Sequence, residues 1–250
     1  MTKESWMLFT AQCIAHLSII PAILFFSPSY FLLTLFVYFL TGCLGMTMTY
    51  HRLLSHKSWD APEWFRKLGT LLGAYGLVGS SIGWVSMHRE HHAYTDTEKD
   101  PHSPHFGWFK AHFLSMFSNP SLRFGVDLVR DPFHVKVHKY YYPTHALIFL
   151  SLAIISPMLL VFGYLLPAAI LWNAGSLINT LNHMSGYRNT ETPDTSTNNP
   201  LTGYFVWGEG WHNNHHANPR SWSFKSKWWE FDWGGFFIKR LKNDKTIETP

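Results

Sequence analysis

The chain has 250 residues and a formal net charge of +4 at neutral pH, with 20 Lys and Arg against 16 Asp and Glu. Only 14% of the residues are charged and 17% are aromatic, whereas about 25% charged residues is usual in soluble proteins. This length allows one large domain or two small ones, and such a mild charge gives no reason to expect a nucleic-acid partner.

The charged residues avoid two long stretches of the chain. Residues 5–50 and 140–187 contain no Asp, Glu, Lys or Arg, so the sequence has two apolar blocks separated by polar ones. About 20 apolar residues make a helix about 30 Å long, enough to cross a bilayer. Core helices of a soluble bundle would show a polar face, which these blocks lack. We therefore expect four transmembrane helices, at about residues 6–26, 30–50, 145–162 and 167–186.

The distribution of Lys and Arg predicts how these helices are oriented. The predicted turns at 27–29 and 163–166 carry no Lys or Arg, whereas residues 51–139 carry eleven and residues 187–250 carry eight. Positively charged segments remain in the cytoplasm. The sequence thus predicts one all-α integral membrane domain, residues 1–250, with two helical hairpins. Both termini and a helical cap, formed by 51–139 and 187–250, should be cytoplasmic.

Two further helical features are expected within the cap. Asp60, Pro62 and Glu63 suit the start of a helix, as cap, first-turn proline and favourable dipole partner. Residues 68–83 are apolar and rich in glycine but too short for a span. We expect this segment to form a helix in the membrane interface or buried against the bundle.

Eight histidines lie in three clusters, all in the predicted cap. Histidines at i, i+3 and i+4 project from one face of a helix, and two of the clusters have this spacing. Neutral imidazole is a good ligand for iron, zinc and copper. The clusters therefore predict a metal centre with the candidate ligands His51, His56, His88, His91, His92, His212, His215 and His216.

Other histidines fit different roles. His16 is isolated in an apolar block and is expected to be a buried polar group. His102 and His105 lie in a proline-rich loop, which favours a surface or supporting position over a ligand position. His134 and His138 have ligand spacing, but their charged neighbours favour a solvated helix face.

His183 stands at the end of the fourth predicted span, one turn after Asn179. Spacing alone leaves two interpretations open: a ninth ligand at the level of the clusters, or a helix-terminal histidine that faces lipid headgroups.

The number of histidines indicates two metals, because one ion takes four to six ligands. Carboxylate-bridged di-iron bundles need two Glu-x-x-His motifs, and Glu209-x-x-His212 is a single copy, which we interpret as chance. Iron changes valence and suits oxygen activation, whereas zinc does not. One alternative is a zinc hydrolase. Another is a membrane protein that binds or transports metal without catalytic activity, although a transporter should place more ligands within its spans.

The boxes HRLLSH, HREHH and GEGWHNNHH, in this order, resemble those of the integral-membrane fatty acyl desaturases, and most closely the Δ9 branch. The resemblance implies nine histidines on two iron ions (Fe²⁺/Fe³⁺), with His183 as the ninth ligand and Asn179 holding a water. It also implies oxygen-dependent removal of two hydrogens from a saturated acyl chain, which gives a cis double bond. A hydroxylase or related di-iron oxidase on the same scaffold is the alternative.

The same resemblance implies partners. Electrons should come from a separate ferredoxin or small b-type cytochrome, since no redox domain is fused to the chain. The substrate could be an acyl-lipid, acyl-CoA or acyl-carrier protein. Acyl-CoA members from animals have Arg-Asp directly before the second box, where this chain has Ser86-Met87, which weakens the case for CoA.

A path for the acyl chain can be predicted from the second span. Counting back from His51 by helical turns of about four residues gives Thr47, Cys43 and Phe39 on one face. We expect this face to line the substrate path with Trp84, and Phe39 to stop the methyl end of the chain. The alternative is that Phe39 faces lipid.

Overall fold

A computed structural model describes residues 2–243. Within this range the regular elements are all helices, joined by turns and irregular loops, and β pairing is limited to the isolated bridges Tyr187–Asn198 and Asn198–Trp211. The predicted all-α class is confirmed. The longer helices are α1 (Lys3–Leu17), α2 (Ile19–Leu24), α3 (Pro28–Tyr38), η1 (Phe39–Ser55), α4 (Glu63–Tyr75), α5 (Ser81–Tyr94), α7 (Pro132–Lys139), α8 (Tyr141–Ile155), α10 (Leu166–Thr180), α11 (Pro200–Phe205), α12 (His212–Ala217) and α13 (Trp233–Leu241). The short ones are η2 (Pro104–Phe106), η3 (Lys110–Leu114), η4 (Ser115–Phe117), η5 (Leu122–Gly125), α6 (Val126–Val129), α9 (Pro157–Leu160), η6 (Val161–Leu165) and η7 (Leu181–His183).

Three continuous helical segments of the described chain are long and apolar enough to cross a membrane. They are Lys3–Leu24, Pro28–Ser55 and Pro157–His183, with 22, 28 and 27 residues. The first two correspond to the predicted spans 6–26 and 30–50. The fourth apolar helix, α8, has only 15 residues.

The predicted boundaries of the last two spans, 145–162 and 167–186, are wrong. The chain turns at Ser156, not at 163–166: Ser156 is extended, because a residue before proline avoids the helical region, and Pro157 opens the next helix. The helix then continues through Gly163. Pro167 lacks an N–H, and the wider turn of η6 just before it, bonded from i to i+5, accommodates the interruption.

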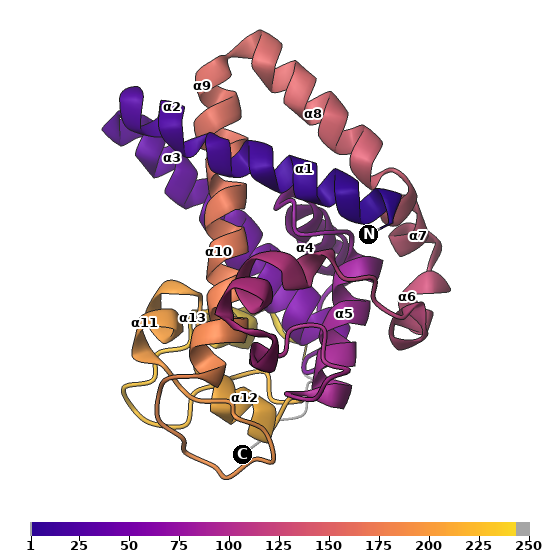
Figure 1. Ribbon diagram of the computed structural model, residues 1–250, viewed down its shortest axis with the longest axis vertical. Coiled ribbons are helices and arrows are strands. Elements are labelled where there is room, and N and C mark those ends of the chain that lie inside the picture. The colour runs from indigo at the N-terminus through magenta and orange to yellow at the C-terminus, as the bar shows by residue number, and fades with distance from the viewer. Residues whose placement is uncertain (1, 244–250) are drawn as a thin grey trace.

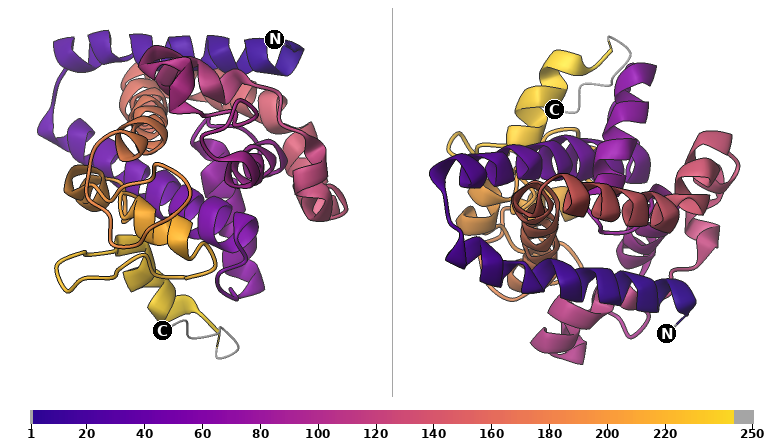
Figure 2. Two further views of the ribbon diagram at one scale, coloured as in Figure 1. Left: turned by 60° about the horizontal axis from the view of Figure 1, so that its bottom comes forward. Right: turned by 90° about the horizontal axis from the view of Figure 1, so that it is seen from above.

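The long segment formed by α9, η6 and α10 runs from the top of the molecule to the lower part that carries α12 (Figure 1). Helix α1 packs against α10 but crosses it, as the view from above also shows (Figures 1 and 2). The turns between α2 and α3 and between α8 and α9 both lie in the upper part. There Leu24 and Ile154 are 72% and 84% exposed, as expected of side chains that meet lipid.

Helix α4 packs closely against η1, and glycines make this possible. A Cβ on Gly45 would lie 2.4 Å from the backbone nitrogen of Gly73, and one on Gly69 would overlap Thr49. A helix does start in the predicted region, with Glu63 in its first turn, but the predicted cap Asp60 is wrong, because α4 begins at Glu63 and Pro62 is its N-cap. The expected single helix over 68–83 is wrong, because α4 ends at Tyr75 and Gly79, at φ +107°, forms the turn into α5.

Helix η1 is wound more widely than an α-helix. The His56 N–H donates to the His51 carbonyl, and the hydroxyls of Thr49 and Ser55 donate to carbonyls five residues back. Such π-helical bonding usually covers only a single turn and often marks a functional site. Residues on one face of η1 are therefore spaced by four to five positions.

Candidate metal centre

The three histidine clusters and His183 meet at the lower end of the molecule. Helix η1 brings His51 and, at its C-cap, His56; α5 brings the second cluster, and α12 the third. His183 comes from η7, directly after α10. The nine side chains separate into two groups, within each of which the candidate ligand atoms all lie within 4.8 Å of one another.

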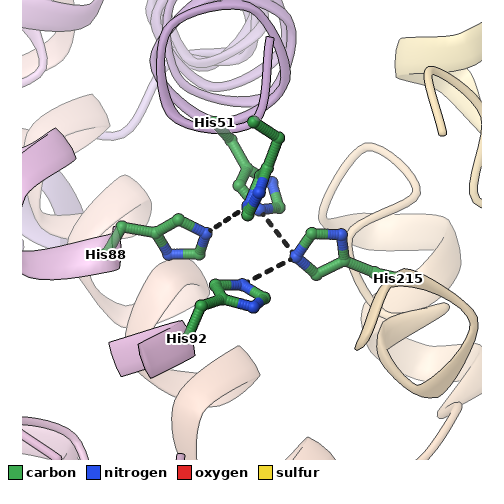
Figure 3. Close-up of side chains that lie close together, drawn as sticks. His51, His88, His92 and His215 are labelled. Carbon is green, nitrogen blue, oxygen red and sulfur yellow. Dashed lines mark hydrogen bonds between the residues drawn. The ribbon is translucent and has the colours of Figure 1, made fainter. Parts of the chain in front are cut away.

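The five-histidine group consists of His51, His56, His88, His92 and His215. Figure 3 shows four of these rings turned toward a common centre from three different helices. The Nε2 atoms of His56 and His88 are 2.8 Å apart, and His215 Nε2 lies 3.1 Å from His51 Nε2 and 3.0 Å from His92 Nε2. Five nitrogens therefore converge on one small volume.

The four-histidine group consists of His91, His183, His212 and His216. The Nε2 atoms of His183 and His212 are 3.1 Å apart. Nε2 of His91 and Nε2 of His216 are buried without any hydrogen-bond partner. Buried polar atoms normally have partners, so these two nitrogens are positioned for a ligand such as a metal ion.

Burial, reinforced by neighbouring imidazoles, lowers the pKa of five clustered histidines of α5 and α12. The pKa is well below the usual 6.5 for His88, His92, His212 and His215, and burial lowers that of His216 to about 4. Metal binding requires neutral imidazole. The residues present therefore fit two metal ions, one in each group.

Three aspartates support the four-histidine group. Each accepts a charge-assisted contact from an Nδ1 atom, at 2.9 Å for His91 with Asp100, 3.2 Å for His183 with Asp96 and 2.8 Å for His216 with Asp194. Burial raises the pKa of Asp194, but the hydrogen bond and charge of His216 outweigh it and hold that pKa far below its usual value. Such contacts fix the orientation of a ligating imidazole.

A different arrangement supports the five-histidine group. Glu209 contacts Nδ1 of His51 and also accepts hydrogen bonds from Arg52, which is fully buried. The Arg52 guanidinium is bound a second time by Asp232, the N-cap of α13. This buried network links the first box to the third box and to the C-terminal helix.

Sequence reasoning missed these supporting residues. Asp96 and Asp100 follow the second box closely, which is a usable signal, but Asp194 and Asp232 have none in the sequence. Glu209 is not a member of either candidate ligand group, so the structure gives no sign of a Glu-x-x-His ligand motif at Glu209-x-x-His212. The interpretation of this motif as chance overlooked the contact of Glu209 with His51.

The discounted histidines His16, His102, His134 and His138 lie outside both groups, and the side chain of His105 lies outside the described part of the structure. The expected solvated helix face is wrong for His134, which is buried and hydrogen-bonded to Ser81; His138 is bonded to Ser80, so this pair joins α7 to the start of α5. His16 is half-buried and bonded through both ring nitrogens. The ring of His102 packs 5.6 Å from that of His91, a supporting position.

A cavity adjoins the histidines. Its wall includes Thr47 and Trp84, both predicted to line the substrate path, and Asn179, the predicted holder of a water. Trp84 also stacks on His88 with ring centroids 5.0 Å apart. Much of the wall is apolar and includes Met46, Val78, Leu171, Trp172, Ile178, Val206 and Trp207.

Phe39 and Cys43 do not line this cavity. Cys43 is buried in a cluster that includes Met48 and Ile238, and Phe39 packs against Trp207 and Phe237. The reason is the wide winding of η1: from His51, steps of four to five residues lead to Met46, Thr47 and Gly42, which do line it. Repeated steps of four residues instead lead from Thr47 to Cys43 and Phe39, which lie off this face.

Comparison with known proteins agrees with this site. The model of the fatty acid desaturase family matches residues 27–231. The chain belongs to the fatty acid desaturase family. The sn-2 palmitoyl-lipid 9-desaturase of Nostoc sp. (strain 36) is 36% identical over 240 residues, 90% of this chain and 84% of that protein. The sn-1 stearoyl-lipid 9-desaturase of Anabaena variabilis is 35% identical, over 85% and 82%. An acyl-CoA 5-desaturase of Anemone leveillei is 32% identical, over 91% and 73%.

The desaturase is therefore an oxidoreductase that desaturates fatty acyl chains, as the resemblance of its boxes predicted. Its two histidine groups are a metal site, and its apolar helices fit a membrane protein. The alternative of a metal-binding membrane protein without catalytic activity is not supported.

Proposed function

We propose that the desaturase introduces a cis double bond at the Δ9 position of a saturated acyl chain, using two iron ions held by nine histidines. The observation that carries the proposal is the division of these histidines into separate groups of five and four beside one cavity. Each group offers about as many ligands as one transition-metal ion takes. Iron is proposed because oxygen-dependent removal of hydrogen needs a metal that changes valence, and zinc does not change valence.

Asn179 completes the smaller group in this proposal. It lines the cavity together with His212, a member of the four-histidine group. Its amide can hold a water as a fifth ligand there, so that both ions have five. When bound, the irons supply the oxygen-dependent removal of hydrogen from carbon.

The protein's own contribution is position. The cavity wall runs from His51 and His88 past Trp84 to the apolar residues of α10, so an acyl chain lying in it passes beside both groups. Holding two neighbouring methylenes at a fixed distance from the metals is where much of the rate enhancement arises. Thr47 and Trp84 are the proposed contacts at this point.

The substrate is proposed to be an acyl chain carried by a membrane lipid. Two of the relatives are named for palmitoyl-lipid and stearoyl-lipid substrates, and Ser86-Met87 lacks the charges that would favour CoA. The electron donor is proposed to be a ferredoxin or a small b-type cytochrome. Both termini and the histidines are proposed to be cytoplasmic, supported by the clustering of Lys and Arg outside residues 5–50 and 140–187.

The test is expression in a host of known lipid composition, followed by mass spectrometry of the acyl chains with location of the double bond. A new cis-Δ9 chain, absent with the His91→Ala variant and without oxygen, is expected. A hydroxylated chain would assign the alternative reaction. A double bond at another carbon would contradict the Δ9 assignment, and an unchanged lipid profile in aerobic cells with abundant protein would contradict the proposal.

A further inference from the structure

We infer that the two metal positions are electrostatically unequal, and that the four-histidine group holds iron in the ferric state at potentials where the five-histidine group holds it ferrous. The inference rests on the proposed two-iron function. It assigns Asp96, Asp100, Asp194 and Glu209 as positioning residues that set this difference.

The four-histidine group is bordered by three carboxylates that form no ion pair with Lys or Arg in the described part of the chain. Arg188 donates to the backbone carbonyl of Asp194 and to Thr192, and the Asp194 carboxylate itself is left to neutral donors. Three of its four imidazoles contact a carboxylate through Nδ1. The other donors to these carboxylates are neutral: Asp96 accepts from Thr195, and Asp194 from Thr192 and Ser196. Asp100 accepts from the backbone N–H groups of residues 96 and 102.

No ion pair within residues 2–243 joins any of these three aspartates to a Lys or Arg. Their side chains are also almost completely buried, with exposed fractions of 9% for Asp96, 0% for Asp100 and 10% for Asp194. Solvent therefore screens these charges poorly, and each acts on the nearby metal position more strongly than an exposed carboxylate at the same distance would.

The five-histidine group has less negative charge beside it. In the described part of the chain, one carboxylate contacts one of its five imidazoles: Glu209, on His51. That carboxylate pairs with the buried Arg52 guanidinium, 3.1 Å away, which also pairs with Asp232. The three groups together carry one negative charge, against three on the aspartates of the four-histidine group. Nδ1 of His215 is buried and has no partner at all.

The physical consequence is a difference in the stability of the ferric state. A carboxylate that accepts the Nδ1 proton makes an imidazole a more basic ligand. Uncompensated negative charge also stabilises a trivalent ion more than a divalent one, because the Coulomb energy grows with the charge. The greater basicity of the ligands and the negative charge both act at the four-histidine group, and both are weaker at the five-histidine group. The first electron delivered to the diferric protein should therefore remain at the five-histidine group.

The experiment is Mössbauer spectroscopy of the full-length protein, loaded with ⁵⁷Fe and poised at a series of potentials. We expect two reduction steps. Asp96→Asn and Asp100→Asn should make only the second step easier, by a factor of about 10 or more, which is about 59 mV for one electron. Asparagine suits position 96, where φ is +61°. Glu209→Gln should move only the first step.

Asp127→Asn is the matched control. It makes the same chemical change on a carboxylate that pairs with Arg89 and Lys57 instead of an imidazole, and it should move neither step. A single two-electron step in the native protein, or an Asp100→Asn variant that moves the first step, would overturn the inference while leaving two irons in place. Fewer than two irons per native chain would instead contradict the proposed function.

Discussion

Among single residues, the buried imidazoles are the most sensitive to conditions. Burial holds their pKa values below 6.5, so in the metal-free protein the folded state binds fewer protons than the unfolded state once the pH falls through about 6.5. The stability that these neutral rings contribute is complete above pH 6.5 and is lost as the pH decreases below it.

We therefore expect the melting temperature of the metal-free protein to fall between pH 7.5 and pH 5.5. Each buried imidazole contributes up to about 1.4 kcal/mol per pH unit below 6.5. The measurement is thermal unfolding in detergent after chelation. A His212→Leu variant removes one such group and should show a shallower dependence. A melting temperature that does not change over this range in the native protein would contradict the prediction.

Substitution of a ligand in either group should abolish desaturation. His88→Ala, in the five-histidine group, and His216→Ala, in the four-histidine group, each remove one metal ligand without touching the membrane-facing surface. His138→Ala is the matched control, since His138 only bonds to Ser80 outside both groups. Acyl-chain profiling should show no product for the first two and most of the native product for the third. Full activity of either ligand variant would exclude that histidine from the site.

How far the site could be predicted depended on where each partner lies in the chain. Eight histidines were predictable because their spacing is local, and the ninth, His183, needed the family resemblance. The carboxylates were not predictable in the same way: His216 contacts Asp194 and His51 contacts Glu209, pairs 22 and 158 positions apart that only the fold brings together. Local patterns give no signal for such pairs.

At the scale of elements, helix geometry decided which predictions held. The first two spans followed from composition alone. The boundary at Ser156 depended on which of two prolines would break a helix, and the widening at η6 allowed Pro167 to be accommodated while Pro157 was not. The substrate wall depended on the wide winding of η1, which a count by four residues per turn cannot anticipate.

This geometry gives a test of the cavity wall. Met46→Trp places a large ring in the cavity and should shift the products toward shorter acyl chains. Phe39→Ala removes a ring that packs on Trp207 and Phe237 outside the cavity, and it should leave the chain-length profile unchanged. The reverse result, longer chains with Phe39→Ala and no change with Met46→Trp, would show that the wall follows residues spaced by four.

At the scale of the whole molecule, an apolar end is opposite a polar, metal-binding end. The turns near Ser27 and Ser156 lie at the upper end of Figure 1, and α12 lies at the lower end. With a cytoplasmic metal centre, these two turns should face the other side of the membrane. Helix α1 crosses α10 and does not lie parallel to it.

Single-cysteine variants test this orientation. In a background without Cys13 and Cys43, Ser27→Cys and Ser156→Cys should react with a membrane-impermeant maleimide added outside intact cells. Lys225→Cys, on an exposed residue of the cap, should react only after permeabilisation. Labelling of Lys225→Cys in intact cells, with protection of the other two, would invert the proposed topology.

The central claim is that two histidine groups each hold one iron, and the iron content of the purified protein tests it most directly. We expect about two irons per chain in the native protein. About one should remain in His92→Ala, which disrupts the five-histidine group, and about one in His91→Ala, which disrupts the four-histidine group. One iron per native chain, or two in either variant, would contradict the division of the nine histidines into two metal sites.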